Sequence, residues 1–156
     1  MEQNEQAFHS KILLFGEYSI IQESMGLSVP YKNFEGQLTF SPTENLDPNF
    51  TEKSNEHLLN FSNYLQEKLV NKELEIDFDL SAFQKDIENG IFFESNIPQG
   101  FGVGTSGAFV AAVYHRYALN KIDLENDNIK ENILLLKSIL AKMESYFHGS
   151  SSGVDP

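Results

Sequence analysis

The chain contains no cysteine, few basic residues and no long apolar run, and each shortage excludes a class of protein. Without cysteine there is no disulfide framework, no thiolate zinc site and no cysteine nucleophile. Lys and Arg number 11 against 23 Asp and Glu, a formal net charge of −12 that repels nucleic acid and anionic lipid. No apolar run approaches the ~20 residues of a membrane span, and the polar N-terminus lacks a secretory signal. We therefore expect a soluble, cytoplasmic protein without a nucleic-acid or membrane partner.

What is present predicts a single globular domain. The chain has 156 residues, of which 40% are hydrophobic and 22% charged, enough for one packed core. Apolar runs and alternation predict strands, whereas spacings of three and four predict helices. The strands are expected at 11–15, 17–21, 26–29, 37–40, 74–80 and 90–95, and the helices at about 52–70, from the glycine loop to about 119, and at 129–147 with Asp127 as a candidate cap. This order is typical of an α+β domain.

The rest of the chain is organised around a glycine-rich stretch at residues 98–108, PQGFGVGTSGA. Gly100, Gly102 and Gly104 can take positive φ and allow close approach of a ligand. A predicted helix follows, and the N–H groups of its first turn lack intrahelical partners and favour a phosphate. Thr105 or Ser106 can cap that helix and still offer a hydroxyl to a ligand or a metal. We interpret the stretch as the phosphate-binding loop of a nucleotide site.

Neither common type of glycine loop fits this stretch. It lacks the Lys-Ser/Thr ending of the Walker loop, and it lacks the dinucleotide pattern with an acidic residue about 20 positions later. Because the chain is strongly acidic, a nucleotide site would need to be locally positive and to use a divalent cation.

Other polar residues carry little information one at a time. Lys11 opens an apolar strand, and Glu144 borders the apolar face of a helix, as many solvated residues do. His148 follows that helix, where it could simply interact with the helix dipole. Asp155 lies near the terminus, where order is least expected.

Taken together, three segments resemble the GHMP kinases, which phosphorylate galactose, homoserine, mevalonate and phosphomevalonate. Residues 11–18 (KILLFGEY) resemble the first motif of that family, and residues 98–108 resemble its second, phosphate-binding motif. Residues 144–155 (ESYFHGSSSGVD) are similar to the segment that carries a metal-binding glutamate and the catalytic aspartate in mevalonate kinases. The motifs occur in the family's order, and the form of the third points to the mevalonate kinase type.

The resemblance implies a role for each matched residue. Gly100, Gly102, Gly104, Thr105 and Ser106 would bind the phosphates of ATP. The Ser106 hydroxyl and the Glu144 carboxylate would hold Mg²⁺. Asp155 would face the substrate hydroxyl as the catalytic carboxylate, and Lys11 would lie between Asp155 and the γ-phosphate. The implied reaction is transfer of the γ-phosphate to a small alcohol, in first place mevalonate.

The resemblance also implies a fold. Residues 1–156 would form the N-terminal domain, with a twisted sheet of about five or six strands, mixed or antiparallel, and helices on one face. Kinases of this family have a second, C-terminal domain that completes the cleft. Since the chain ends just after Asp155, we expect it to be a fragment of a longer two-domain kinase and to be inactive in isolation. The sequence leaves a homodimer open.

Departures from the family pattern keep other functions open. His9, Ser10 and Tyr18 replace the usual proline, glycine and histidine near the acceptor, which favours another GHMP kinase, of the galactokinase or phosphomevalonate kinase type, as an alternative. A second alternative is a truncated domain without catalysis. A third is an RNA-associated protein of the translation apparatus that shares the domain type, and the net charge weighs against it.

Overall fold

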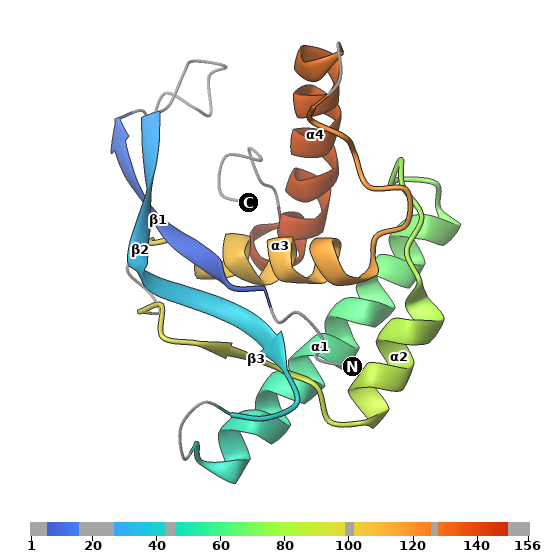
Figure 1. Ribbon diagram of the computed structural model, residues 1–156. Helices are drawn as coiled ribbons and strands as arrows, with labels where there is room; N and C mark the ends of the chain where they lie inside the picture. The colour runs from blue at the N-terminus through green and yellow to red at the C-terminus, as the bar shows by residue number, and fades with distance from the viewer. Residues whose placement is uncertain (1–5, 16–26, 43–45, 99–101, 126–127, 150–156) are drawn as a thin grey trace.

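The computed structural model describes residues 6–15, 27–42, 46–98, 102–125 and 128–149. Within these ranges the elements follow in the order β1, β2, α1, α2, β3, α3, α4 (Figure 1). The predicted α+β class is confirmed, because the helices pack against a sheet of antiparallel strands.

The sheet of the described residues has three strands in the order β1-β2-β3. β1 (Phe8–Phe15) pairs antiparallel with β2 (Leu27–Thr39), and β2 pairs antiparallel with β3 (Phe92–Ser95). The expectation of five or six strands is therefore wrong for the described part of the chain. The two strands predicted at 26–29 and 37–40 form one continuous strand, and the strand predicted at 17–21 lies outside the described residues.

Residues 74–80 correct a second prediction. Their alternation was expected to give a strand, and the burial does alternate: Leu74, Ile76 and Phe78 are buried whereas Glu75 and Asp77 are exposed. The backbone nevertheless makes only an isolated bridge, between Phe78 and Ala118. The alternating pattern thus reports which side chains reach the core and not whether a partner strand lies alongside.

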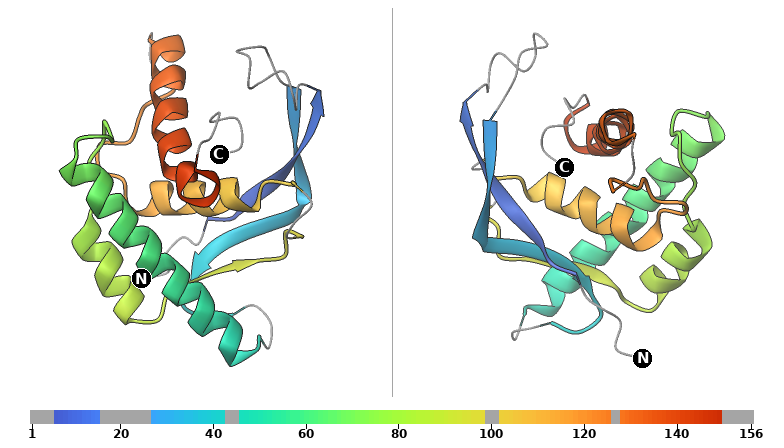
Figure 2. Two further views of the ribbon diagram at one scale, coloured as in Figure 1. Left: turned by 180° about the vertical axis from the view of Figure 1, so that it is seen from behind. Right: turned by 45° about the horizontal axis from the view of Figure 1, so that its top comes forward.

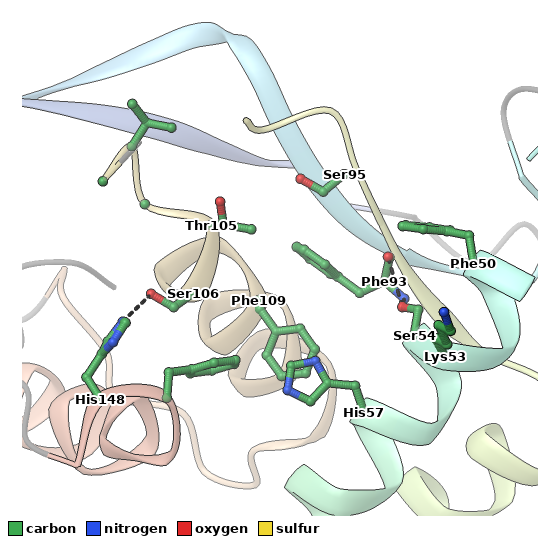
Figure 3. A pocket seen from close by; sticks show the side chains of 14 residues that line it. Phe50, Lys53, Ser54, His57, Phe93, Ser95, Thr105, Ser106, Phe109 and His148 are labelled. Carbon is green, nitrogen blue, oxygen red and sulfur yellow. Dashed lines mark hydrogen bonds between the residues drawn. The ribbon is translucent and has the colours of Figure 1, made fainter. Parts of the chain in front are cut away.

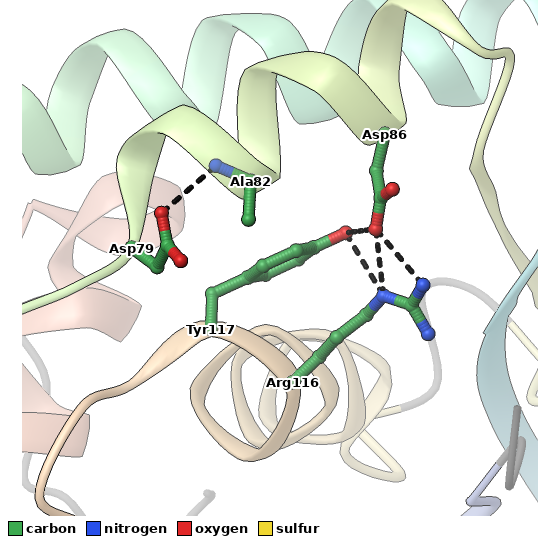
Figure 4. A network of polar contacts seen from close by, with 5 residues as sticks. All are labelled: Asp79, Ala82, Asp86, Arg116 and Tyr117. Atoms are coloured by element: carbon green, nitrogen blue, oxygen red, sulfur yellow. Dashed lines mark hydrogen bonds and ion pairs between the residues drawn. The ribbon is translucent and has the colours of Figure 1, made fainter.

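Among the described residues, two helices precede the glycine loop. α1 (Pro48–Val70) begins about four residues before the predicted helix, because the Asp47 carboxylate accepts a hydrogen bond from the Asn49 N–H and Pro48 suits the first turn. α2 (Leu80–Glu88) was not predicted from the sequence. Its start is capped by Asp79, which accepts from the N–H of Ala82 at 2.9 Å (Figure 4).

A polar network attaches α2 to α3 (Thr105–Tyr117). Asp86 Oδ2 accepts from Arg116 Nη2 at 2.8 Å, from Arg116 Nε at 3.0 Å and from the Tyr117 hydroxyl at 3.0 Å (Figure 4). The Tyr117 ring also stacks on Phe83 of α2, with centroids 4.2 Å apart. Burial raises the pKa of Tyr117 well above its ordinary value, so the phenol stays a donor to Asp86.

The last helix, α4 (Ile129–His148), agrees closely with the prediction. Its N-cap is Asn128. The predicted cap, Asp127, lies outside the described residues. Helix α4 ends where Gly149 takes φ of +72°, a conformation that favours glycine. This end places Glu144 and His148 one turn apart at the C-terminus of the helix.

The four helices of the described residues lie on one side of the sheet in both views of Figure 2. Helix α1 packs on β3 and α3 packs on β1 and β2, while α2 and α4 cover α1 and α3. The core between these layers is rich in aromatic rings, and Phe109 of α3 is at its centre, with ring centroids 5.2 Å from Phe61 and Phe93 and 5.4 Å from Phe147. The expectation of helices on one face is thereby confirmed.

The hairpin of β1 and β2 extends beyond β3 (Figure 1). Ile12 and Val29 are register partners there, and both are more than a third exposed, as are Leu14 and Leu27. The described residues therefore leave an apolar surface on this part of the sheet. None of the helices in the described ranges has the length and apolar character needed to cross a membrane.

Candidate functional site: a pocket at the start of helix α3

The site is built on the turn that starts α3. Gly104 is the N-cap residue, with φ of +87°, and no side chain caps the helix. The expected capping role of Thr105 or Ser106 is therefore wrong: Thr105 is already the first helical residue, and a left-handed glycine makes the turn. Without a side-chain cap, the N–H groups of the first turn have no partner within the helix and can receive an anion.

The first strand reaches the same turn. The Lys11 N–H donates to the carbonyl oxygen of Val103 at 3.2 Å, and a Cβ built on Gly104 would lie 3.2 Å from Lys11 Cγ. Lys11 thus packs directly on the turn at Gly104. A larger residue at position 104 would displace its side chain.

Ser106 joins α3 to α4. Its hydroxyl donates to Glu144 Oε1 at 2.9 Å, and its oxygen lies 3.4 Å from His148 Nε2. Glu144 is completely buried, at 0% exposure, although it carries a carboxylate. A carboxylate that deep in a protein is costly unless polar groups surround it, so its position favours a functional role.

Ser106 and His148 line a pocket of about 660 Å³ (Figure 3). One wall is the turn from Gly102 to Ser106, and the opposite wall is the first half of α1. The end of β3 and the C-terminus of α4 close the sides. Outside the turn from Gly102 to Ser106, most of the side chains that line the pocket are aromatic or basic: Phe50, Lys53, His57, Phe93, Phe109, Phe147 and His148. Its volume is in the range of small-molecule sites.

The α1 wall was missed in the sequence, where the helix was interpreted only as an amphipathic element. His57 stacks on Phe109 with ring centroids 5.3 Å apart and touches the rings of Tyr146 and Phe147. Burial lowers the pKa of His57 below its ordinary value of 6.5, so the ring is a neutral, flat surface at neutral pH. The available signal was its spacing: His57 lies four residues before the core residue Phe61.

The structure brings most of the predicted site residues together. Lys11, Gly102, Gly104, Thr105 and Ser106 meet at the turn, and Glu144 reaches it from α4. Gly100 and Asp155 lie outside the described residues. The geometry therefore bears on the phosphate side of the predicted site, while the catalytic carboxylate remains an expectation.

The donor set at Ser106 fits a hard cation. A hydroxyl and a carboxylate offer oxygen ligands, which Mg²⁺ prefers, and it commonly binds through one or two carboxylates plus phosphate oxygens and water. Within the described ranges no three His, Asp or Glu side chains gather into a metal-binding group. A cation at Ser106 and Glu144 would accordingly need further ligands from a phosphate or from water.

Comparison with known proteins identifies the family of the chain. No curated protein and no solved structure matches it. The family model described as the GHMP kinases N terminal domain matches residues 62–156, which include the glycine loop, Glu144 and Asp155. Because this match covers more than half of the sequence, the chain belongs to the GHMP kinase family and carries the N-terminal domain of these phosphotransferases.

Proposed function

We propose that the chain forms the nucleotide-binding half of a kinase that transfers the γ-phosphate of ATP to a small alcohol. The observation that carries the proposal is the contact of Ser106 with the buried Glu144 at the uncapped start of α3, on the rim of a pocket. An anion at that helix start and a cation between the two side chains would neutralise each other's charge.

The pocket divides into a polar and an aromatic side, which suits the two ends of a nucleotide. The phosphates would lie on the backbone N–H groups from Gly102 to Ser106. The nucleoside would extend toward α1, where Phe50 and the neutral His57 ring offer apolar surfaces and Lys53 adds a positive charge. This orientation also places basic groups, Lys11 and Lys53, on both sides of an anionic ligand.

Ser106 and Glu144 would hold Mg²⁺, and the cation would supply positive charge to offset the negative charge that develops during phosphate transfer. The chain's own contribution is to supply two oxygen ligands from rigid helices. The burial of Glu144 keeps water from competing for its carboxylate and strengthens its interaction with a cation.

Positioning would supply most of the remaining catalysis. A carboxylate is far too weak a base to remove an alcohol proton before the new bond forms. Asp155 would therefore orient the substrate hydroxyl and accept its proton late, as expected for a loose phosphoryl-transfer transition state. Lys11, held against Gly104, would balance negative charge between that carboxylate and the γ-phosphate.

Mevalonate is the acceptor that we propose first, because the third motif, ESYFHGSSSGVD, resembles the mevalonate kinase form. Another GHMP kinase acceptor, such as galactose or phosphomevalonate, is the alternative, favoured by His9, Ser10 and Tyr18 at the strand that would face it. A domain that binds the nucleotide without completing the cleft is the third proposal.

Nucleotide binding and phosphate transfer can be tested separately. Thermal unfolding of the 156-residue chain should shift upward with Mg-ATP, by an amount that grows with ligand concentration. The Ser106→Ala variant should lose most of this shift, whereas Ser145→Ala should keep it, since the Ser145 hydroxyl only contacts Ala141 O within α4. If Mg-ATP shifts neither the wild type nor Ser145→Ala, the nucleotide proposal is wrong.

A kinase assay then addresses the acceptor. ADP release would be followed with ATP, Mg²⁺ and either mevalonate, phosphomevalonate or galactose, both in this chain and in any longer form of the protein. Turnover with mevalonate supports the first proposal, and turnover with another alcohol supports the alternative. Binding of Mg-ATP without turnover on any acceptor would support the non-catalytic domain.

A further inference from the structure

We propose that His148 is a positioning residue that accepts a hydrogen bond from the Ser106 hydroxyl when the Ser106 oxygen becomes a cation ligand. This inference rests on the proposed nucleotide site. It concerns a residue with no role in the predicted site, although His148 lines the pocket and lies 3.4 Å from the Ser106 oxygen.

A hydroxyl has one proton and two lone pairs, whereas an ionised carboxylate can only accept. In the structure the Ser106 proton is directed at Glu144 Oε1 over 2.9 Å. This hydrogen bond gives the buried carboxylate a donor.

The same hydrogen bond is incompatible with a cation shared by both groups. A cation held between the Ser106 oxygen and the Glu144 carboxylate would occupy the space in which the proton now lies. The hydroxyl must then turn its proton to another acceptor, because a donor without a partner is unfavourable. Ser106 is half-buried and lines the pocket, so an acceptor fixed by the protein would hold the hydroxyl in the ligand orientation better than water does.

His148 Nε2 meets this requirement. A neutral imidazole that carries its proton on Nδ1 presents Nε2 as an acceptor, and the Ser106 oxygen already lies 3.4 Å away. Figure 3 shows the His148 ring directed from α4 toward the Ser106 side chain. A small rotation of the hydroxyl would therefore exchange one acceptor, Glu144, for the other.

The end of α4 fixes this arrangement. Glu144 and His148 are four residues apart and lie on the same face of the helix. The neighbouring Phe147 is packed against Phe109 with ring centroids 5.4 Å apart, and Gly149 ends the helix by donating its N–H to Ser145 O. The two acceptors of Ser106 thus belong to one rigid turn.

The test compares two amides at position 148. In His148→Gln the amide can reach the place of Nε2, whereas in His148→Asn it reaches only as far as Nδ1. The half-saturating Mg²⁺ concentration would be measured at fixed ATP by the shift of thermal unfolding, and ATP binding alone would be measured in EDTA.

We expect the Asn variant to need about 3–10-fold more Mg²⁺, which corresponds to about 0.65–1.4 kcal/mol, within the usual contribution of one net hydrogen bond. The Gln variant should stay within about twofold of the wild type. ATP binding in EDTA and the urea midpoint without ligand should be the same in all three proteins, which a merely structural role of His148 would not allow.

Other results would overturn the inference. If the Asn variant had the same Mg²⁺ dependence as the wild type, the proposed role of His148 would be wrong, while the proposed nucleotide site would be unaffected. Equal losses in both variants, or weaker ATP binding in EDTA, would indicate that the ring itself contacts the phosphates. A wild type without any Mg²⁺-dependent response to ATP would contradict the proposed function, and this inference with it.

Discussion

Lys11 lies against Gly104 so closely that a Cβ at position 104 would be 3.2 Å from Lys11 Cγ. The contact joins two segments that are far apart in the sequence, the first strand and the glycine loop, at the start of α3. Glycine is favoured at position 104 for two reasons. A side chain there would meet Lys11, and the backbone has φ of +87°, which other residues rarely adopt.

Replacing Gly104 by alanine should therefore have two effects. The left-handed backbone should cost about 1–2 kcal/mol of unfolding free energy. The new methyl group should also move Lys11 and weaken binding of Mg-ATP, as measured by thermal shift or calorimetry.

Gly90→Ala is the matched control for this prediction. Gly90 has φ of +85°, but a Cβ there would have no heavy atom within 4 Å. The two variants should lose similar stability in urea unfolding, and only Gly104→Ala should lose nucleotide affinity. Equal affinities would show that the Lys11 contact is unimportant for binding.

Glu144→Gln should distinguish the role of Glu144 in cation binding from its role in stability. The amide is nearly isosteric with the buried carboxylate and can still accept the Ser106 hydrogen bond, so the urea midpoint should change little. The Mg²⁺ dependence of ATP binding should be lost, because the charged ligand is gone. A Gln variant that retains the Mg²⁺ dependence of the wild type would exclude Glu144 as a ligand.

Asp86→Ala should destabilise the fold by about 1.5–3 kcal/mol, the range for hydrogen bonds to a charged group. The carboxylate accepts from Arg116 and Tyr117 together, so its loss removes the polar link between α2 and α3. Tyr117→Phe removes one of these donors and should cost about 1 kcal/mol in the same urea experiment. A smaller loss for Asp86→Ala than for Tyr117→Phe would contradict the network.

Acid should destabilise the protein partly through His57. Burial lowers the pKa of His57 below 6.5 in the fold, so at pH values below 6.5 the unfolded chain binds the proton first. The stability due to the neutral ring is fully present above pH 6.5 and is lost as the pH falls through the folded pKa. His57→Phe keeps an aromatic ring and should reduce the loss of unfolding free energy between pH 7 and about 5.

His115 should account for a further part of that slope, because burial, together with the charge of Lys121, lowers its pKa in the same direction. The double variant His57→Phe, His115→Phe should consequently have the flattest profile. A His57→Phe profile parallel to that of the wild type would show that His57 is not protonated differently in the two states.

The sequence predicts an element of the fold well where the residue pattern depends on that element alone. The apolar residues of α4 recur at helical spacing and predict the bounds of the helix almost to the residue, because a surface helix packs one apolar face on the core along its length. Residues 74–80 alternate in the same clear way, but strand pairing depends on a neighbour that the segment does not encode. Helix α2 was missed although Asp79 caps it and Phe83 and Ile87 recur at helical spacing.

The candidate site divides in a similar manner. The glycine loop indicates a phosphate site from its composition alone, and the resemblance to a family supplied Lys11 and Glu144. The α1 wall was not predicted: the spacing of His57 before Phe61 places it on the buried face of the helix, but it does not show that α1 packs beside β3 and borders the same pocket as the start of α3. The sequence places His148 at the end of a helix, but it does not indicate the contact of His148 with Ser106.

The apolar surface of the β1–β2 hairpin has a consequence for how the protein behaves in concentrated solution. Ile12, Leu14, Leu27 and Val29 would favour self-association, and the formal charge of −12 opposes it by mutual repulsion. Added salt screens that repulsion over distances of about 10 Å at 0.1 M. Colloidal stability of this chain is therefore a balance that shifts with ionic strength, and low-salt buffers favour the dispersed state.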